Sequence, residues 1–294
     1  MTTETPNFTH FAAIDWSGAK GRRHKGIAIA ICDIGNAAPR LVRPGHVWSR
    51  TEALEWLLKT AAEAPTLFGF DFSFAPPIAA RGEYLPGQTD VPKTAREFWA
   101  YVESHCDDED LGAASFLEQS HRRHFYFGIA DGVKARFMHF RQCDARLNDQ
   151  GGRKTASAYD AIGAAQVAKA SFSGMRLLHR LDGRVAIWPF DFARSGRVDA
   201  PKDISAVVEI YTRIYLRNAG LTGTKLRSRA ELNIALKALG SAPARLRFEP
   251  NDHQTDAIVT AAGMRALASR PESWSPAGLT PELARGEGWT FGIL

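Results

Sequence analysis

The sequence predicts an α/β protein, with a mixed sheet covered by helices, and three patterns predict this class. An apolar run at residues 11–14 ends in Asp15, and a glycine-containing loop joins it to a second apolar run at 26–32, as in a β-hairpin. A further run at 66–70 is also apolar and also ends in an acid, Asp71. Helical patterns lie between and after these runs, so strands and helices belong to one unit.

The other elements follow in chain order. Residues 40–48 predict a third strand interrupted at Pro44-Gly45, so that the first three strands form a meander. Thr51 is the expected N-cap of a helix that ends at Ala64-Pro65 and leads into the fourth strand. The later elements are a helix over 157–181, short strands at 185–188 and 206–211, a helix over 228–239, and a last helix from 251 to about 268.

The stretch from about 78 to 156 has a looser pattern. It holds aromatic-rich helical turns, an acidic run at 107–110 and a segment dense in cations and aromatics. We therefore expect a helical insertion, or cap, after the fourth strand, and we treat 1–294 as a single domain.

Composition narrows the class of protein. The chain has 294 residues, of which 45% are hydrophobic and 23% charged, as in ordinary globular proteins. The sequence has no apolar run long enough for a bilayer and its start lacks a secretory pattern. Its three cysteines form no CxxC pair, so we expect reduced thiols in a cytoplasmic protein. The net charge of +5 permits an anionic partner. The sequence leaves open whether the chain is a homo-oligomer.

Acidic residues on four predicted elements could converge on one site. Asp15 and Asp71 end strands, and Glu209 lies within a later strand. On the last helix, Asp252 and Asp256 are four residues apart and His253 and Asp256 are three apart, so their side chains share one face. If that helix packs on the sheet, its acids face the strand ends. The candidate catalytic residues are Asp15, Asp71, Glu209, His253 and Asp256.

Crowded carboxylates repel one another unless protons or cations neutralise them. Oxygen-rich sites without thiolates suit Mg²⁺ or Mn²⁺. Two such ions, roughly 3.5–4 Å apart, can activate a water and stabilise the leaving oxygen of a phosphodiester. The candidate metal ligands are Asp15, Asp71, Asp252 and Asp256, and His253 could orient water, accept a proton or coordinate the ion.

Each of these residues also has an ordinary structural role open to it. Asp252 is a good helix N-cap, and Asp71 could cap the turn at 73–76. Glu209 could pair with Arg213, and His253 could be a surface residue. These roles require four separate coincidences, whereas a shared site requires one cause, so we favour the shared site.

A basic, aromatic segment offers a surface for a polyanion. Its cations could neutralise phosphates while its aromatic rings stack on bases. Alternatively, the rings are core of the inserted region and the arginines are only solvated. The candidate nucleic-acid-binding residues, including three from the turn after Asp15, are Arg22, Arg23, Lys25, Arg122, Arg123, Arg141, Arg153 and Lys154.

Short motifs spread over nearly the whole chain carry a resemblance to a known family. They are Ala13-Ile14-Asp15, Gly69-Phe70-Asp71, the helix over 158–181 with Gly174-Met175-Arg176-Leu177-Leu178, Ile187-Trp188-Pro189-Phe190, Val208-Glu209-Ile210-Tyr211, His253-Gln254-Thr255-Asp256-Ala257 and the stretch 287–293. With these motifs the chain resembles the RNase H-like superfamily, which includes RNase H and RuvC-type resolvases. More closely, it resembles a bacterial family described as predicted RNase H-like nucleases.

The resemblance implies a mixed five-stranded core sheet with flanking helices. It also implies that Asp15, Asp71 and Asp256 are metal ligands supported by His253 or Glu209. One departure is that the acid usual on the helix after the third strand of RNase H has no obvious match. Glu52 and Glu55 are candidates only if their helix faces the site.

The predicted function is therefore metal-dependent hydrolysis of phosphodiester bonds in DNA or RNA, structured or single-stranded. Two other functions stay open. The first is ATP-dependent phosphoryl transfer of the actin-like or sugar-kinase type, because 15–18 faintly resembles a first phosphate loop. The second is a non-catalytic module that binds nucleic acid or a protein, because a fold alone does not decide function.

Overall fold

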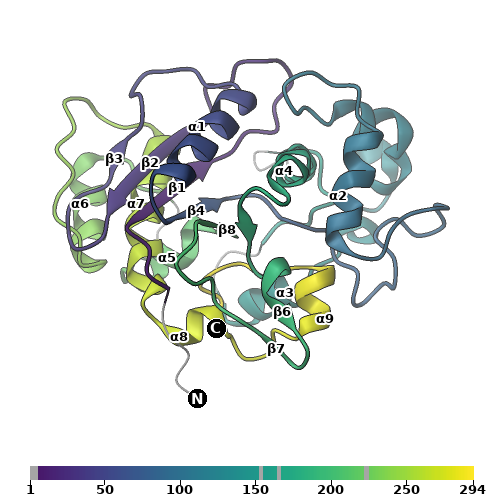
Figure 1. The fold of residues 1–294 in the computed structure, drawn as a ribbon. Helices are drawn as coiled ribbons and strands as arrows, with labels where there is room; N and C mark the ends of the chain where they lie inside the picture. The colour runs from purple at the N-terminus through teal and green to yellow at the C-terminus, as the bar shows by residue number, and fades with distance from the viewer. Residues whose placement is uncertain (1–5, 152–154, 164–166, 222–224) are drawn as a thin grey trace.

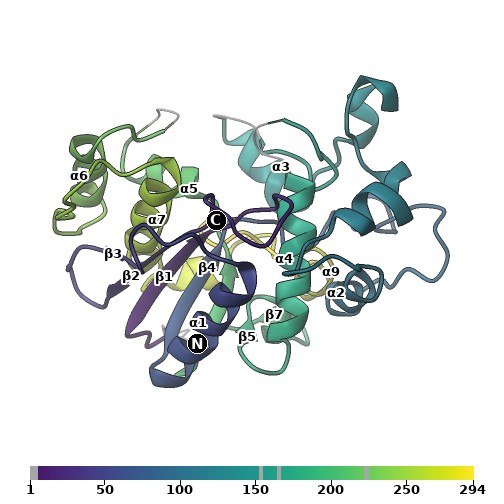
Figure 2. The same ribbon diagram turned by 90° about the horizontal axis from the view of Figure 1, so that it is seen from above.

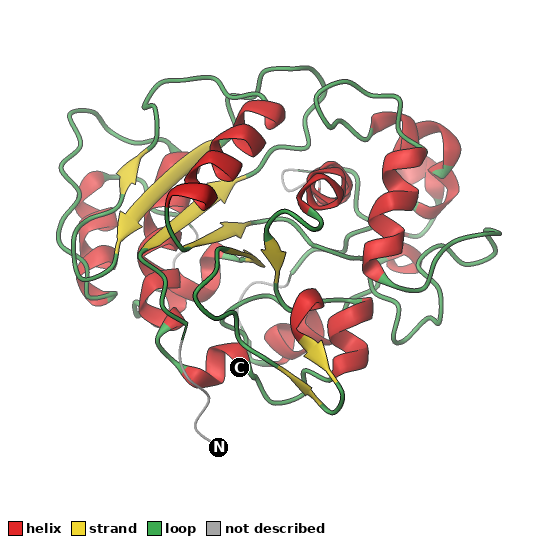
Figure 3. Ribbon diagram, in the orientation of Figure 1, coloured by secondary structure: helices red, strands yellow, loops and turns green. Residues whose placement is uncertain are grey.

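The computed structural model describes residues 6–151, 155–163, 167–221 and 225–294. Its centre is a six-stranded sheet in the order β3-β2-β1-β4-β8-β5 (Figures 1 and 3). The α/β class is thus confirmed, but the expected count of five strands is wrong because a short edge strand adds to one side of the sheet. The strands are β1 (His10–Asp15), β2 (Ala28–Asp33), β3 (Arg40–Leu41), β4 (Thr66–Phe70), β5 (Ala186–Ile187) and β8 (Ala206–Glu209).

Strand directions bring the acidic strand ends to one edge of the sheet. β1, β2 and β3 are successive antiparallel neighbours, as the predicted meander requires. β4 runs parallel to both β1 and β8, with Ile14 opposite Phe70 and Phe70 opposite Glu209. Carboxyl ends of parallel strands lie at the same edge, so Asp15, Glu209 and Asp71, which directly follows β4, come out together.

Helices cover both faces of the sheet. Figure 2 shows α7 and α5 on one side and α1 on the other. The main helices are α1 (Arg50–Glu63), α2 (Ala95–Ser104), α3 (Gln142–Asp149), α4 (Val167–Leu181), α5 (Thr212–Asn218), α6 (Arg229–Ala238) and α7 (Asp252–Ala268). No helix in the described ranges is long and apolar enough to cross a membrane.

Close packing fixes α7 on its face of the sheet. A Cβ at Gly263 would lie 2.4 Å from the Tyr215 ring, and one at Gly69 would lie 2.6 Å from the sulfur of Met264. Only glycine permits these approaches, one between α7 and α5 and the other between α7 and β4. The small residues of α7 therefore hold its first turns at a defined place over the strand ends.

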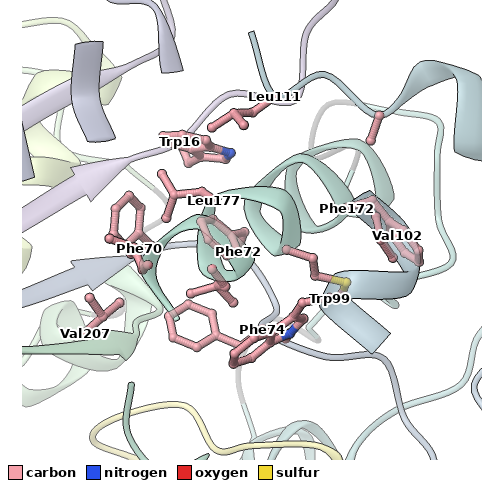
Figure 4. Packing of buried hydrophobic residues seen from close by; sticks show 14 of the residues in the cluster. Trp16, Phe70, Phe72, Phe74, Trp99, Val102, Leu111, Phe172, Leu177 and Val207 are labelled. Carbon is pink, nitrogen blue, oxygen red and sulfur yellow. The ribbon is translucent and has the colours of Figure 1, made fainter. Parts of the chain in front are cut away.

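Aromatic rings fill the other face, between the sheet and α4 (Figure 4). Trp16, Phe70 and Phe72 pack edge-on or tilted, with centroids 5.4–5.8 Å apart. The Trp16 ring nitrogen donates to the hydroxyl of Ser173 at 2.9 Å. A Cβ at Gly174 would lie 2.3 Å from the Phe72 ring. Only a glycine at this position lets α4 pack so closely on the ring. The residues that flank Asp15 and Asp71 are thus held by the core.

The expected insertion is helical but lies against α4. It contains α2, α3 and several short turns between them. Phe98, Phe116 and Phe125 are buried and each contacts the Phe172 ring of α4. These rings of the inserted region are therefore core, and no stacking surface for bases is available from them.

Several predicted boundaries differ from the structure. Ser49, not Thr51, caps α1 through a complete capping box with Glu52. The third strand is limited to Arg40–Leu41. The helix expected from 157 begins at Val167, because the backbone at 159–161 pairs with Tyr126 instead. Shorter elements that we did not predict include the hairpin of β6 (Ala193–Arg194) and β7 (Arg197–Val198), with α8 (Pro271–Trp274) and α9 (Pro281–Gly286).

Candidate functional site

Asp15 and His253 join the sheet to α7 at the candidate site. Asp15 is the last residue of β1 and is nearly buried, at 9% exposure. Its Oδ1 lies 3.0 Å from Nδ1 of His253, on the first turn of α7. The His253 side chain remains about half exposed. The predicted approach of the last helix to the first strand end is therefore confirmed.

Asp71 is bound to the neighbouring strand end. Its Oδ1 accepts a hydrogen bond from the backbone N–H of Trp16 at 2.7 Å, which ties β4 to the residue after Asp15. The turn that Asp71 could have capped is held by other residues, since the N–H of Ser73 donates to Ser171 and that of Phe74 donates to Glu209. Asp71 thus links the end of β4 to the residue that follows β1.

The acids are close enough to affect one another's ionisation. Burial, followed by the charge on Asp256, holds the pKa of Asp15 well above its ordinary value. Burial, followed by the charge on Asp15, does the same to the pKa of Asp71. Burial is also the main reason why the pKa of Asp256 rises to about 6, and the charge on Asp252 adds to it. Three elements thus place mutually repelling carboxyls together.

Asp252 does not cap its helix, because a neighbouring residue does. Asn251 is the N-cap of α7 and forms a complete capping box with Gln254. The carboxylate of Asp252 instead meets Lys225, with 2.5 Å between Nζ and Oδ2. This hydrogen bond lowers the pKa of Asp252, and the Lys225 charge also acts to lower the pKa of Asp15 and Asp256. No sequence pattern had indicated Lys225.

The donor set fits a hard divalent cation, although the candidate ligands do not already have the arrangement of a metal site. Asp15, Asp71, Asp252 and Asp256 offer carboxylate oxygens, which Mg²⁺ and Mn²⁺ prefer. In the described part of the chain, no three or more His, Cys, Asp or Glu side chains are arranged as a ready metal site. Coordination would therefore need side-chain adjustment around a common centre.

The raised acid pKa values predict an unusual pH dependence of stability in the metal-free protein. Between pH 4 and 6 the fold retains a proton on Asp256 that the unfolded chain releases, so the free energy of unfolding falls as pH rises. Raising this pKa from 3.8 to about 6 corresponds to roughly 3 kcal/mol. Urea unfolding in EDTA across this range measures the decline. In Asp256→Asn the decline should be smaller, and a wild-type stability that rises over the same range would contradict the prediction.

Glu209 does not belong to the candidate site, and its predicted catalytic role is corrected. The residue is buried, and its Oε1 accepts from Thr290 at 2.6 Å while its Oε2 accepts from the N–H of Phe74 at 2.8 Å. Both oxygens also bind the guanidinium of Arg141, at 2.5 and 2.6 Å. Arg213 is therefore not its partner. Glu209 anchors the loop that carries Asp71.

Arg141 is likewise not on a nucleic-acid surface, which corrects that prediction. It is 2% exposed and binds Asp144 as well as Glu209. Buried charges of this kind are compensated by one another and cannot reach a phosphate from outside.

The other predicted cations fall into three groups. Most have partners within the protein: Arg22 binds Glu109, Arg23 binds Glu52, Arg122 binds Asp131, and Arg123 donates to Gly87 and Gln88. Lys25 is exposed and has no hydrogen bond or ion pair with any described residue. Arg153 and Lys154 lie outside the described residues.

The two alternative acids of α1 and the phosphate-loop glycine can also be placed. The carboxylate of Glu52 is occupied by the N–H of Ser49, by Arg23 and by His46, so it is not a free ligand. Glu55 is exposed on the same helix. A Cβ at Gly18 would lie 2.2 Å from the backbone of α4, so this glycine serves helix packing. The phosphate-loop interpretation gains no support from it.

Comparisons of the chain with protein-family models, with curated proteins and with solved structures found no match.

Proposed function

We propose that the protein hydrolyses phosphodiester bonds in nucleic acid with a divalent ion held by Asp15, Asp71 and Asp256. The observation that carries the proposal is that β1, the end of β4 and α7 bring these carboxyls together, where burial and mutual charge raise their pKa values. Without a cation, such a cluster lowers the stability of the fold at neutral pH. A bound divalent ion would neutralise the carboxylates and restore this stability. It would also supply positive charge to the phosphodiester during hydrolysis.

Each residue has a distinct part in this reaction. Asp15, Asp71 and Asp256 would hold Mg²⁺ or Mn²⁺, and Asp252 would complete the set when Lys225 releases it. When bound, the ion polarises the phosphate and lowers the pKa of a water. His253 contacts Asp15 through Nδ1, which leaves Nε2 to accept a proton from the attacking water or to donate one to the leaving oxygen.

Two measurements on the unaltered protein test the proposal. Calorimetric titration with Mn²⁺ should show binding that EDTA abolishes. Cleavage of single-stranded DNA, duplex DNA and RNA should then depend on Mg²⁺ or Mn²⁺. Binding of nucleic acid without turnover under any divalent ion would replace the hydrolase with a binding module. Calorimetric binding of ATP would instead favour phosphoryl transfer.

A further inference from the structure

A pocket opens at the edge of the sheet, one strand away from the candidate site. β3 pairs with β2 only through Arg40 and Leu41, and the chain returns to the loop before β2 where Trp48 bridges to His24. Between these points residues 43–47 form a turn outside the sheet. The cavity that results has a volume of about 240 Å³. We call it the edge pocket; Val42 is the partly exposed apolar residue of its wall, and the buried side chains of Ile27, Ile29 and Trp48 also line it.

Hydrogen-bond donors surround this apolar interior. The pocket is also lined by Lys25, Arg43 and Gln254. Neither the Lys25 ammonium nor the Arg43 guanidinium has a hydrogen bond or ion pair with any described residue; the Arg43 guanidinium lies over the Trp48 ring, 5.1 Å from its centroid. Arg43 also has a φ of 49°, in the left-handed region that side chains rarely adopt. Strained backbone of this kind concentrates at functional sites.

The edge pocket shares its walls with the carboxylate site. Ala28 lines the pocket and is the strand partner of Asp15. A Cβ at Gly26, next to Lys25, would lie 3.5 Å from the His253 ring. On α7, His253 binds Asp15 while the next residue, Gln254, lines the pocket. A ligand in the pocket would therefore be a near neighbour of anything bound at the carboxyls.

The chemistry of the walls specifies the ligand. The two cations Lys25 and Arg43 favour an anion. The apolar walls favour a flat, poorly solvated group, and the volume suits one base and not a duplex. An unpaired nucleotide combines these properties, because unpaired bases enter pockets that base pairs cannot.

We propose that the edge pocket binds one unpaired nucleotide of the substrate strand, with its phosphate at Lys25 and Arg43 and its base against Val42. This inference rests on the proposed function, and it narrows the substrate to nucleic acid that is single-stranded beside the cleaved bond. The phosphodiester at the carboxyls would then be adjacent to the nucleotide held in the pocket.

Lysine acylation read by mass spectrometry tests the pocket in the unaltered protein, in EDTA so that no metal chemistry is needed. The probes are a short single-stranded oligonucleotide, a nucleoside monophosphate and inorganic phosphate. Lys25 should be protected by the oligonucleotide, and less strongly by the monophosphate. Lys59, exposed on α1, is the internal control and should react equally throughout. Equal protection of Lys25 by inorganic phosphate would reduce the pocket to a general anion site and overturn the proposal.

Charge variants test the same point through affinity. Lys25→Gln/Arg43→Gln should weaken binding of the labelled oligonucleotide by at least about tenfold, the effect of losing one hydrogen bond to a charged group. Arg40→Gln/Lys59→Gln removes the same charge outside the pocket and should have a much smaller effect. Val42→Trp fills the pocket without changing charge and should also weaken binding. Equal losses in the two double variants would overturn the proposal.

The outcomes separate this inference from the proposed function. Protection of Lys25 without metal-dependent cleavage would exclude the proposed hydrolysis and support nucleotide binding in the edge pocket. Cleavage that needs Mn²⁺ while Lys25 stays unprotected would support the hydrolase and remove the pocket.

Discussion

Replacing Asp15 with asparagine is expected to abolish metal-dependent cleavage while making the metal-free protein more stable. Asp15 is the acid that α7 approaches most directly, through His253 at 3.0 Å. Loss of a residue that only hydrogen-bonds to a metal ligand typically lowers metal affinity or activity by roughly 10–100-fold. Loss of the ligand itself should lower both by more. Stability should rise because burial and the charge on Asp256 disfavour the ionised form of Asp15, as its raised pKa shows. Calorimetry with Mn²⁺, cleavage rates and urea unfolding in EDTA measure the three effects.

A matched control separates the site from a general loss of charge. Asp33 ends β2 at the opposite end of the hairpin, half exposed beside Arg40. Asp33→Asn should leave cleavage and Mn²⁺ binding unchanged. Asp71→Asn should likewise abolish cleavage. The fold should be retained in this variant, because the asparagine amide oxygen can still accept from the N–H of Trp16. Cleavage that survives in both Asp15→Asn and Asp71→Asn would exclude the proposed site.

Replacing Arg141 with methionine is expected to give the largest loss of stability, about 3–5 kcal/mol in the free energy of unfolding. The substitution leaves Glu209 and Asp144 buried without their shared cation. Because Glu209 also holds the N–H of Phe74, the loop that begins at Asp71 should loosen as well. Urea unfolding measures the first effect, and Mn²⁺ affinity measures the second.

Arg22→Met provides the comparison for this prediction. Arg22 also pairs with a glutamate, Glu109, but both side chains are about two-thirds exposed. Exposed ion pairs contribute little, so the unfolding midpoint should hardly change. If Arg141→Met were as mild as Arg22→Met, the buried network would not be what anchors the Asp71 loop.

Local pattern was enough to predict the main sheet and the approach of its acids. Apolar runs that end in Asp15 and Asp71 predicted the strands. Spacing on α7 then placed Asp252, His253 and Asp256 together. These features depend on neighbours in sequence and on one assumption, that the helix lies on the sheet.

Long-range pairing explains what the sequence did not predict. Arg141 lies in a basic stretch and looks like a surface residue, but its partner Glu209 is 68 positions away. Lys225 meets Asp252 across 27 positions. Likewise, residues 157–181 were predicted to form one helix, yet the backbone at 159–161 pairs with Tyr126 because tertiary contacts override weak propensities. Charge sign alone does not reveal which partner the fold supplies.

The position of α7 and of residues 287–293 has a consequence for protein synthesis. β1 and β4 leave the ribosome long before α7, which supplies His253 and Asp256, and before Thr290 and Phe291, which bond to Glu209. Domains fold as units once their sequence is complete. A nascent chain that stops short of α7 therefore carries Asp15 and Asp71 without His253 and Asp256, so the candidate site assembles only after α7 has been synthesised.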